Sequence, residues 1–191
     1  MNILLLGPQG SGKGTQAKRI SAEYSFPHIA TGDILRDAIA RETPLGLEVK
    51  PIVESGRLVS DELITALIRE RLEAEDTRDG FVLDGFPRTL AQAEALDEML
   101  REIGRELAIV FELQIPDAVC TERLLKRAQE EGRKDDTPEV IARRLQIYHR
   151  ETAPLVEHYR TQGIVVGVQA DATVNEVFNQ IQQALEQVAV R

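Results

Sequence analysis

Residues 7–16 read GPQGSGKGTQ, and this stretch decides the fold expected for the chain. It follows a short apolar run, ILLL at 3–6, and precedes a helical pattern carried by Ala17, Ile20 and Tyr24. Glycines here let backbone N–H groups converge on phosphate oxygens, and the partial positive charge of a helix N-terminus adds to that attraction. The order of strand, glycine-rich loop, lysine and helix therefore predicts a P-loop, in which Lys13 reaches the β- and γ-phosphates of a nucleotide.

The residue after Lys13 departs from the common form of this loop. The usual pattern ends Gly-Lys-Ser/Thr, and its hydroxyl coordinates Mg²⁺. Here Gly14 occupies the hydroxyl position and Thr15 comes one residue later. We therefore expect Mg²⁺ to be held mostly by phosphates and water, which suits its reluctance to lose water ligands.

Further short apolar runs recur along the chain, and amphipathic stretches lie between them. The clear runs are 81–83, 108–115 and 164–168, with a weaker one at 26–30. Helical spacing follows Ser60, follows Thr137 and Pro138 over 137–160, and covers 174–188. In 137–160 it places Ile141, Leu145 and Tyr148 on one core-facing stripe. The alternation predicts an α/β fold with a parallel sheet, whose ligand lies beyond the carboxyl ends of the strands.

The bulk composition limits the class of protein. The 191 residues suit one compact domain, and a hydrophobic content of 42% is enough for a buried core. The 23 Lys and Arg side chains against 32 Asp and Glu give a net charge of −9. This charge argues against nucleic acid or an anionic membrane as the main partner, and it leaves room for a local basic pocket that binds a small anion.

The single cysteine, Cys120, excludes an intrachain disulfide and a four-cysteine zinc site. We expect it to be a small buried side chain in a helix. The apolar run after Met1 is too short for a signal peptide and lacks a basic flank, and no apolar stretch approaches the ~18 residues of a membrane span. A reducing, cytoplasmic compartment is therefore expected.

A wider set of motifs resembles the adenylate kinase family. Besides the phosphate loop, these are TGDILR at 31–36, DGFPRT followed by Gln92 at 84–92, and RKDD at 133–136 followed by Arg144. They span most of the chain in the order and spacing of that family. The resemblance implies reversible, Mg²⁺-dependent transfer of a phosphoryl group from ATP to AMP, giving two ADP. It also implies a cytoplasmic monomer whose partners are these small nucleotides.

The resemblance implies a three-layer P-loop kinase fold with a five-stranded parallel sheet, within a single nucleoside monophosphate kinase domain over 1–191. Its core would be 1–30, 60–126 and 137–191, with a helical monophosphate-binding insertion at 31–59 and a short lid at 127–136. Residues 128–136 are expected to form a polar loop. The lid has no cysteines and is short, so no structural zinc is expected. Gly32, Gly56 and Gly132 are possible hinges for closure over both nucleotides, which would exclude water.

The residues 123–136, RLLKRAQEEGRKDD, carry many cations for an acidic chain. Phosphoryl transfer to an acceptor that is already ionised needs no strong base, and it depends on positioning and on neutralising charge. Arginine suits this task because its fork matches phosphate oxygens. By resemblance, the catalytic set is Lys13, Arg88, Arg127, Arg133 and Arg144.

The resemblance also assigns two nucleotide sites, in which Arg123 stacks on the ATP adenine, Arg36 and Arg88 bind the AMP phosphate, and Thr31 and Gln92 contact the AMP base. The ATP site comprises Gly10, Ser11, Gly12, Lys13, Gly14, Thr15, Arg123, Arg127 and Ala172. The AMP site comprises Thr31, Arg36, Arg57, Leu58, Val59, Gly85, Phe86, Pro87, Arg88, Gln92, Arg133 and Arg144.

Several side chains keep more than one interpretation. Asp84, at the end of a strand, is expected to hold Mg²⁺ through water, and its alternative is a turn or cap residue. Leu35 and Ile64 pack on the AMP ring or belong to the core. Asp135 and Asp136 either orient lid arginines or are simply solvated. Lys126 and Lys134 are expected to be solvated surface charges.

Three other functions compete with this interpretation. A UMP/CMP kinase of the same fold tends to carry Ala where Thr31 stands and Asn near Gln92, so these two residues favour AMP. A nucleotide-binding switch protein would carry Asn-Lys-x-Asp and Asp-x-x-Gly, and neither occurs in the chain. A scaffold built on a decayed kinase fold would not keep the full set of phosphate-binding cations.

Overall fold

The computed structural model describes residues 1–133 and 136–189, and its centre is a five-stranded parallel sheet. The strands are β1 (Asn2–Leu6), β2 (His28–Ala30), β3 (Phe81–Asp84), β4 (Ile109–Gln114) and β5 (Val165–Gln169), in the order β2-β3-β1-β4-β5. Ile3 of the central strand pairs with Val82 on one side and with Ile109 on the other. The parallel sheet and the α/β class expected from the sequence are confirmed.

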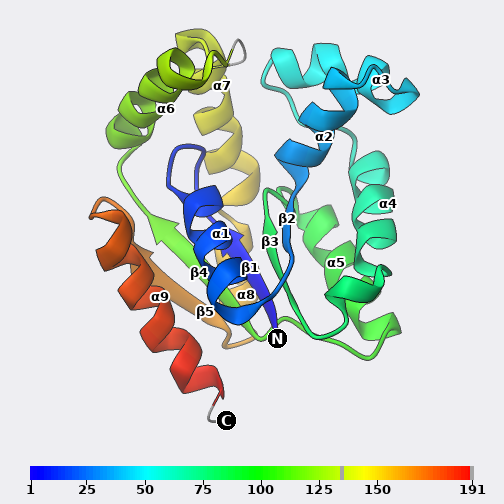
Figure 1. Cartoon of the computed structure of the whole chain (residues 1–191), viewed down its shortest axis with the longest axis vertical. Helices are drawn as coiled ribbons and strands as arrows, with labels where there is room; N and C mark the ends of the chain where they lie inside the picture. Colours follow the sequence, from blue (N-terminus) through cyan, green and yellow to red (C-terminus); the bar gives the residue numbers. More distant parts are fainter. Residues whose placement is uncertain (134–135, 190–191) are drawn as a thin grey trace.

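The side chains of β1 alternate between two hydrophobic layers, as a strand buried on both faces requires. Ile3 and Leu5 face a layer formed with α1 (Lys13–Tyr24) and α9 (Val174–Ala189). Leu4 and Leu6 face the other layer, formed with α4 (Asp61–Leu72), α5 (Leu90–Glu102) and α8 (Leu155–Arg160). Figure 1 shows α1 and α9 in front of the sheet, and α5 and α8 behind it. The result is a three-layer fold.

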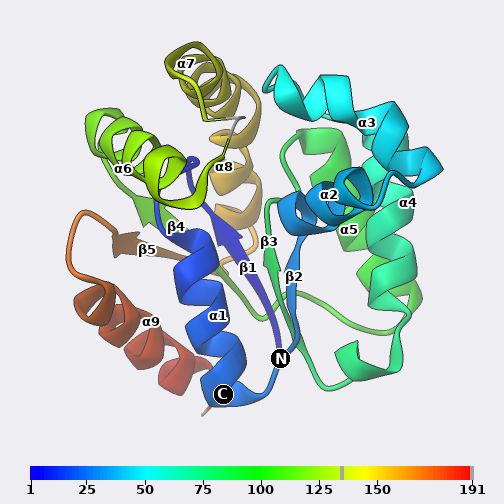
Figure 2. The same ribbon diagram turned by 45° about the horizontal axis from the view of Figure 1, so that its top comes forward.

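Two pairs of helices stand beyond the carboxyl ends of the strands (Figures 1 and 2). One pair is α2 (Thr31–Ala40) and α3 (Pro44–Glu54), which follows β2. The other is α6 (Asp117–Glu131) and α7 (Pro138–Ile147), which follows β4. A small cluster centred on Cys120 and Ile141 packs α6 against α7, so Cys120 is the buried helical residue expected.

The sequence-based boundaries were wrong in the region after Cys120. Helix α6 continues to Glu131 and ends at Gly132, whose φ of 63° is left-handed, so residues 128–131 of the polar loop expected at 128–136 are helical. The pattern at 137–160 is interrupted by a π-helical turn at Tyr148–Thr152 and by Pro154 before α8 begins. Lys134 and Asp135 lie outside the described residues.

The turn between α2 and α3 brings two backbones into direct contact at Gly46. Thr43 caps α3, and its Oγ1 accepts a hydrogen bond from the Gly46 N–H at 3.0 Å. A Cβ atom at Gly46 would lie only 2.0 Å from the carbonyl oxygen of Ala38 in α2. Glycine therefore stands here because no side chain fits between the helices.

None of the helices in the described part of the chain combines the length and the apolarity that crossing a bilayer requires.

The contact at Gly46 predicts a change in stability on substitution by alanine that is opposite to the change expected from helix propensity. Alanine normally stabilises a helix interior by about 0.5–1 kcal/mol relative to glycine. Gly46→Ala should instead lower the free energy of unfolding by roughly 1–3 kcal/mol, because α2 and α3 must separate to admit the methyl group. Urea unfolding would measure this loss, and an unchanged or higher stability would contradict the close packing of the two helices.

Candidate functional site

A cleft with a cavity volume of about 630 Å³ opens where the carboxyl ends of the strands face the two helix pairs. The lining includes Leu6 at the end of β1, Gly7 after it, Thr31 after β2, Asp84 of β3 and Ala170 after β5. With one exception, every site residue expected from the sequence lines this cleft. The exception is Phe86, which is 1% exposed and packs in the hydrophobic layer with α4 and α5.

The phosphate loop forms a tight backbone turn between β1 and α1. Gly10 and Gly12 have φ angles of 84° and 94°, which a residue with a side chain rarely adopts. Ser11 N–H donates to the Pro8 carbonyl at 3.2 Å, and its Oγ is buried without a hydrogen-bond partner among the described residues. The loop therefore has the conformation and polar groups of a phosphate-binding turn.

The same loop rests directly on the first turns of α6. A Cβ atom at Gly10 would lie 2.7 Å from the carbonyl oxygen of Cys120 and 3.1 Å from Leu124 Cγ. The glycine is required here both by its φ angle and by the lack of space.

The Lys13 ammonium lies folded against the loop. Its Nζ donates to the carbonyls of Gly7 at 2.7 Å and Pro8 at 2.9 Å. Burial lowers the pKa of Lys13, and the nearby guanidinium of Arg88 lowers it further, against the opposing effect of Asp84. The cleft thus holds a buried cation that no described carboxylate bonds directly, which favours binding of an anion.

Arg88 is held by three hydrogen bonds, one to its side chain and two to its backbone. Its Nε donates to the Gly85 carbonyl at 2.7 Å, its N–H donates to Gln92 Oε1 at 2.7 Å, and its carbonyl accepts from Thr152 Oγ1 at 2.8 Å. Burial lowers the pKa of the guanidinium, and Arg36 and Arg144 add to this effect by charge repulsion. Asp84 acts in the opposite direction, but the pKa still lies below its ordinary value. The bond to Gly85 thus holds a buried guanidinium whose positive charge a bound anion would stabilise.

Asp84 is the carboxylate nearest to the phosphate loop. Its Oδ2 lies 3.6 Å from His28 Nε2 and 3.5 Å from the position that a Cβ on Gly14 would take. Burial raises the pKa of Asp84, but His28, Lys13 and Arg88 together outweigh burial, so the pKa lies below its ordinary value. Asp84 is therefore an ionised group within the cleft at neutral pH.

Two arginines, one from α6 and one from α7, share one carboxylate. Arg127 donates to Asp136 Oδ2 through Nε at 2.9 Å and Nη2 at 2.6 Å, and Arg144 Nη1 donates to Oδ1 at 2.8 Å. The side chain of Asp136 is fully buried, whereas Arg127 and Arg144 keep 31% and 12% of their surface exposed. The structure thus supports the interpretation in which Asp136 orients these two arginines toward the cleft.

Two further arginines of this region have partners of their own. Arg133 Nε pairs with Glu131 at 2.7 Å near the end of α6. Arg123 Nη1 donates to the Ala170 carbonyl at 3.1 Å, which ties α6 to the loop that also contains Ala172. Arg123 and Ala172 therefore lie together, as a shared base-binding position requires.

On the opposite side of the cleft, Gln92 is the central polar residue. It is 2% exposed, and its Nε2 donates to Asp61 Oδ1 at 2.6 Å. Thr31 Oγ1 donates to the Asp84 carbonyl at 3.4 Å, and Arg36 pairs with Asp33 at 2.5 Å. Leu35 and Ile64 belong to the core and also line the cleft, so their core interpretation is confirmed and their packing on the AMP ring stays a prediction.

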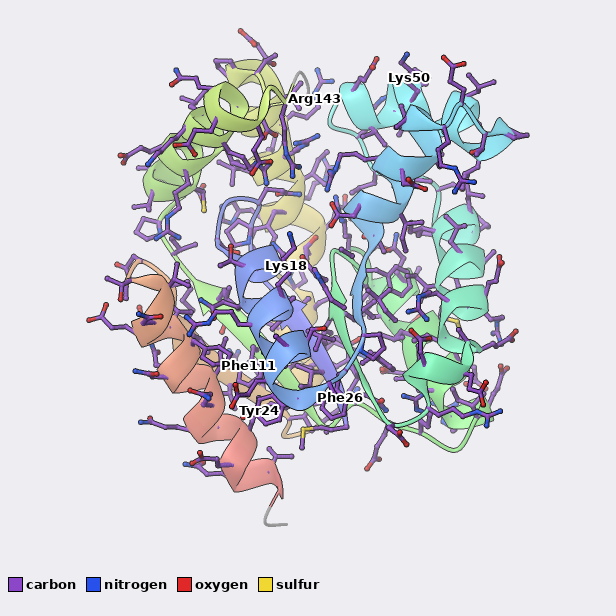
Figure 3. The ribbon with its side chains drawn as sticks, viewed as in Figure 1. Lys18, Tyr24, Phe26, Lys50, Phe111 and Arg143 are labelled. Carbon is purple, nitrogen blue, oxygen red and sulfur yellow. The ribbon has the colours of Figure 1, made fainter. Side chains whose placement is uncertain are left out.

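The two helix pairs touch each other above the cleft. Arg143 of α7, labelled in Figure 3, donates through Nη1 to the carbonyl of Ser55 after α3 at 2.8 Å. Arg144 Nη2 reaches the carbonyl of Val53 at 3.4 Å, and a Cβ on Gly56 would meet Val140 at 2.9 Å. Of the three possible hinges, Gly56 and Gly132 have left-handed φ angles, whereas Gly32 lies inside α2.

The charge of the cleft is opposite to that of the chain. Among residues 1–133 and 136–189, nine Lys and Arg side chains line it, against three Asp and Glu side chains. The nine are Lys13, Lys18, Arg36, Arg57, Arg88, Arg123, Arg127, Arg133 and Arg144; the three are Asp33, Asp84 and Glu131. A cleft of this charge and volume suits nucleotides, which are polyanionic.

Sequence reasoning missed several residues of the cleft. Tyr148 was expected in the core, but the π-helical turn brings it into the lining, and burial raises its pKa to about 12. Lys18, His28 and Thr152 also line the cleft. Only Lys18 carried a signal, its position on the helix that follows the phosphate loop; the others are brought in by the tertiary fold.

Comparison with known proteins points to one family. The family model for adenylate kinase matches residues 5–164. An adenylate kinase from a Cyanothece species is 48% identical over 97% of this chain and 95% of its own length. Adenylate kinases from Micrococcus luteus and Xylella fastidiosa are 47% and 45% identical over 97% of this chain, and the match covers 91% and 99% of their lengths.

The lowered pKa of Asp84 gives a pH-dependent prediction. A carboxyl group whose pKa is lower in the folded state stabilises the fold above its unfolded pKa and loses this contribution as the pH falls through the folded pKa. The stability difference between the native chain and Asp84→Asn should therefore be largest near pH 7 and shrink from about pH 4 downward. Urea unfolding of both proteins without nucleotide, from pH 7 to 3, would measure it; a difference that stays constant would contradict the assigned interactions.

Proposed function

The chain belongs to the adenylate kinase family, and on this premise we propose that the cleft binds ATP at the phosphate loop and AMP beside Gln92. The activity is that of the family: a phosphoryl group moves reversibly from ATP to AMP, and two ADP are formed. The observation that carries the assignment of the site is the convergence of Lys13, Arg88, Arg127, Arg133 and Arg144 on one cleft of an acidic chain.

The proposed mechanism needs fixed positive charge and little else. The AMP phosphate that attacks is already ionised, so no side chain has to remove a proton. Lys13 and Arg88 approach the transferred group from the sheet, and Arg127, Arg133 and Arg144 approach it from the α6–α7 side. These cations stabilise the charge spread over the equatorial oxygens in the transition state, and they hold donor and acceptor in line.

For the donor, we assign the phosphates to residues 10–15 and the base to the space between Arg123 and Ala172. The hydrogen bond from Arg123 to the Ala170 carbonyl supports this assignment because it positions the guanidinium beside the loop after β5. The face of that guanidinium can then stack on adenine. The α6–α7 side, including residues 127–136, is the proposed lid.

For the acceptor, we assign residues 31–59 as the monophosphate-binding insertion. Arg36 and Arg88 would bind the phosphate, and Thr31 and Gln92 would face the base. The backbone of Arg57, Leu58 and Val59 lines the same side of the cleft. Gly85 and Pro87 hold the segment that carries Arg88, while Phe86 anchors this segment in the core.

Mg²⁺ arrives with ATP, and Asp84 would hold it through water. The residues fit this role: one ionised carboxylate lies beside the phosphate loop, and among residues 1–133 and 136–189 no three acidic, His or Cys side chains form a cage that could bind the ion directly. When bound, Mg²⁺ neutralises charge on the phosphates. Thr15 follows the usual hydroxyl position by one residue, so we assign it no direct contact with the ion.

We further propose that the protein acts as a cytoplasmic monomer, without nucleic acid or membrane as a partner. The net charge of −9 supports the absence of polyanionic partners. Sedimentation at micromolar concentration would test the monomer, and a stable dimer would overturn it.

Removing one central cation should slow the chemistry. Lys13→Ala and Arg88→Ala are each expected to lower kcat by about 10²–10³, because each loses a charge that acts mainly in the transition state. A coupled assay with saturating ATP, AMP and Mg²⁺ measures this. The matched control is Lys126→Ala, a residue of α6 that is 73% exposed and pairs only weakly with Glu130 at 3.7 Å. Full kcat in Lys13→Ala would refute the phosphate assignment.

The choice of acceptor tests the base site separately. With ATP as donor, AMP should react far faster than CMP or UMP, and Gln92→Ala should raise the KM for AMP without raising the KM for ATP. The reason is that Gln92 lies on the acceptor side of the cleft, at the start of α5. Equal rates for the three monophosphates would count against the acceptor assignment.

A further inference from the structure

The side chain of Gln92 is held at both ends of its amide group. The carbonyl oxygen Oε1 accepts the backbone N–H of Arg88 at 2.7 Å, and the amino nitrogen Nε2 donates to Asp61 Oδ1 at 2.6 Å. At 2% exposure the amide is buried, although it still lines the cleft. A buried amide with both ends bonded cannot rotate without breaking two hydrogen bonds.

The chemistry of the two partners fixes the orientation of the amide. A peptide N–H can only donate, and an aspartate carboxylate can only accept. A rotation of the amide by 180° would place Nε2 against the Arg88 N–H and Oε1 against the Asp61 carboxylate, so two donors and two acceptors would face each other. One lone pair of Oε1 and one N–H of Nε2 remain for a ligand, in a fixed order.

Asp61 reaches this position through the caps of two helices. It is the first residue of α4, after the capping residue Ser60, and its Oδ1 also accepts from Thr89 Oγ1 at 3.1 Å. Thr89 is in turn the cap of α5 and accepts the N–H of Gln92 at 3.3 Å. Asp61 itself lines a second, smaller groove with Ser60 and Thr89, behind Gln92 as seen from the cleft.

We propose that Asp61 is the positioning residue that determines base selectivity, because it fixes the Gln92 amide in the orientation that matches adenine. This inference rests on the proposed role of Gln92 at the acceptor base. Adenine offers an amino donor at C6 beside the acceptor N1, which complements a carbonyl and an N–H. A 6-oxopurine offers the reverse, an acceptor at C6 beside N1–H, and would need the rotated amide. Asp61 opposes that rotation without touching the substrate.

The test compares AMP with IMP, which differ in these groups of the purine. Asp61→Ala removes the acceptor, and Asp61→Asn keeps the shape while allowing either orientation of Gln92. The ratio of kcat/KM for AMP to that for IMP should fall about tenfold in Asp61→Ala, as expected when one hydrogen bond to a charged group no longer fixes the amide. It should fall less in Asp61→Asn, and the KM for ATP should stay unchanged in both.

Asp97→Asn is the matched control. It also removes a carboxylate of α5, which accepts from Gln162 at 3.1 Å and lies 2.9 Å from Nε2 of His158 in α8. These partners lie away from the cleft, so the AMP/IMP ratio should stay at the native value. Thermal unfolding of every variant separates selectivity from stability, because a purely structural role of Asp61 would lower Tm and reduce both kcat/KM values equally.

A double variant tests whether Asp61 acts through Gln92. Gln92→Ala should lower the ratio, and Asp61→Ala combined with Gln92→Ala should lower it no further, because Asp61 acts only through Gln92. If Gln92→Ala lowers the ratio but Asp61→Ala does not, the inference about Asp61 is overturned and the acceptor site stands. If Gln92→Ala itself leaves the ratio unchanged, the base-reading role of Gln92 fails, and the inference fails with it.

Discussion

Repulsion between like charges is the constraint around which this molecule is built. Nine cationic side chains surround one cleft that contains three carboxylates, and several of these cations are partly or fully shielded from water. The fold holds them by a few specific contacts: backbone carbonyls accept from Lys13 and Arg88, and the single buried carboxylate of Asp136 joins Arg127 to Arg144. A bound polyanion completes the neutralisation that the protein leaves unfinished, so substrate binding and the stability of the cleft are coupled.

The sheet supplies the positions at which these contacts form. Parallel strands end on one side, so the phosphate loop after β1, Thr31 after β2, Asp84 at the end of β3 and Ala170 after β5 meet although they are far apart in the sequence. Local sequence then refines each position. Gly10 permits a left-handed turn above Cys120, and Thr43, Ser60 and Thr89 start three helices with side-chain caps. The catalytic geometry therefore depends on helix starts as much as on the arginines themselves.

Much of this arrangement could be predicted from the sequence because its signals are local. A buried strand followed by a glycine-rich loop and a helix predicts a phosphate-binding site. The helical pattern around Cys120 correctly predicted that this residue is buried in a helix. Features that depend on contacts between distant segments could not be predicted. The π-helical turn that moves Tyr148 into the cleft and the hydrogen bond from Thr152 to Arg88 have no local signature. For Phe86 the local signal was misleading. The motif predicted it in the AMP site, but its apolar ring packs in the core.

The seating of Gly10 on Cys120 limits how the upper half of the molecule can deform. With 2.7 Å between a hypothetical Cβ and the Cys120 carbonyl, and with Leu124 buried next to it, the first two turns of α6 have no free space against the loop. Tilting of that helix from its root would displace the glycine turn, which close packing resists. Bending is therefore confined to the part of α6 beyond Leu124. This part contains the exposed last turn of the helix and ends at Gly132. Because the start of α6 is packed against the phosphate loop, the C-terminal end of this helix can move while the loop keeps its position.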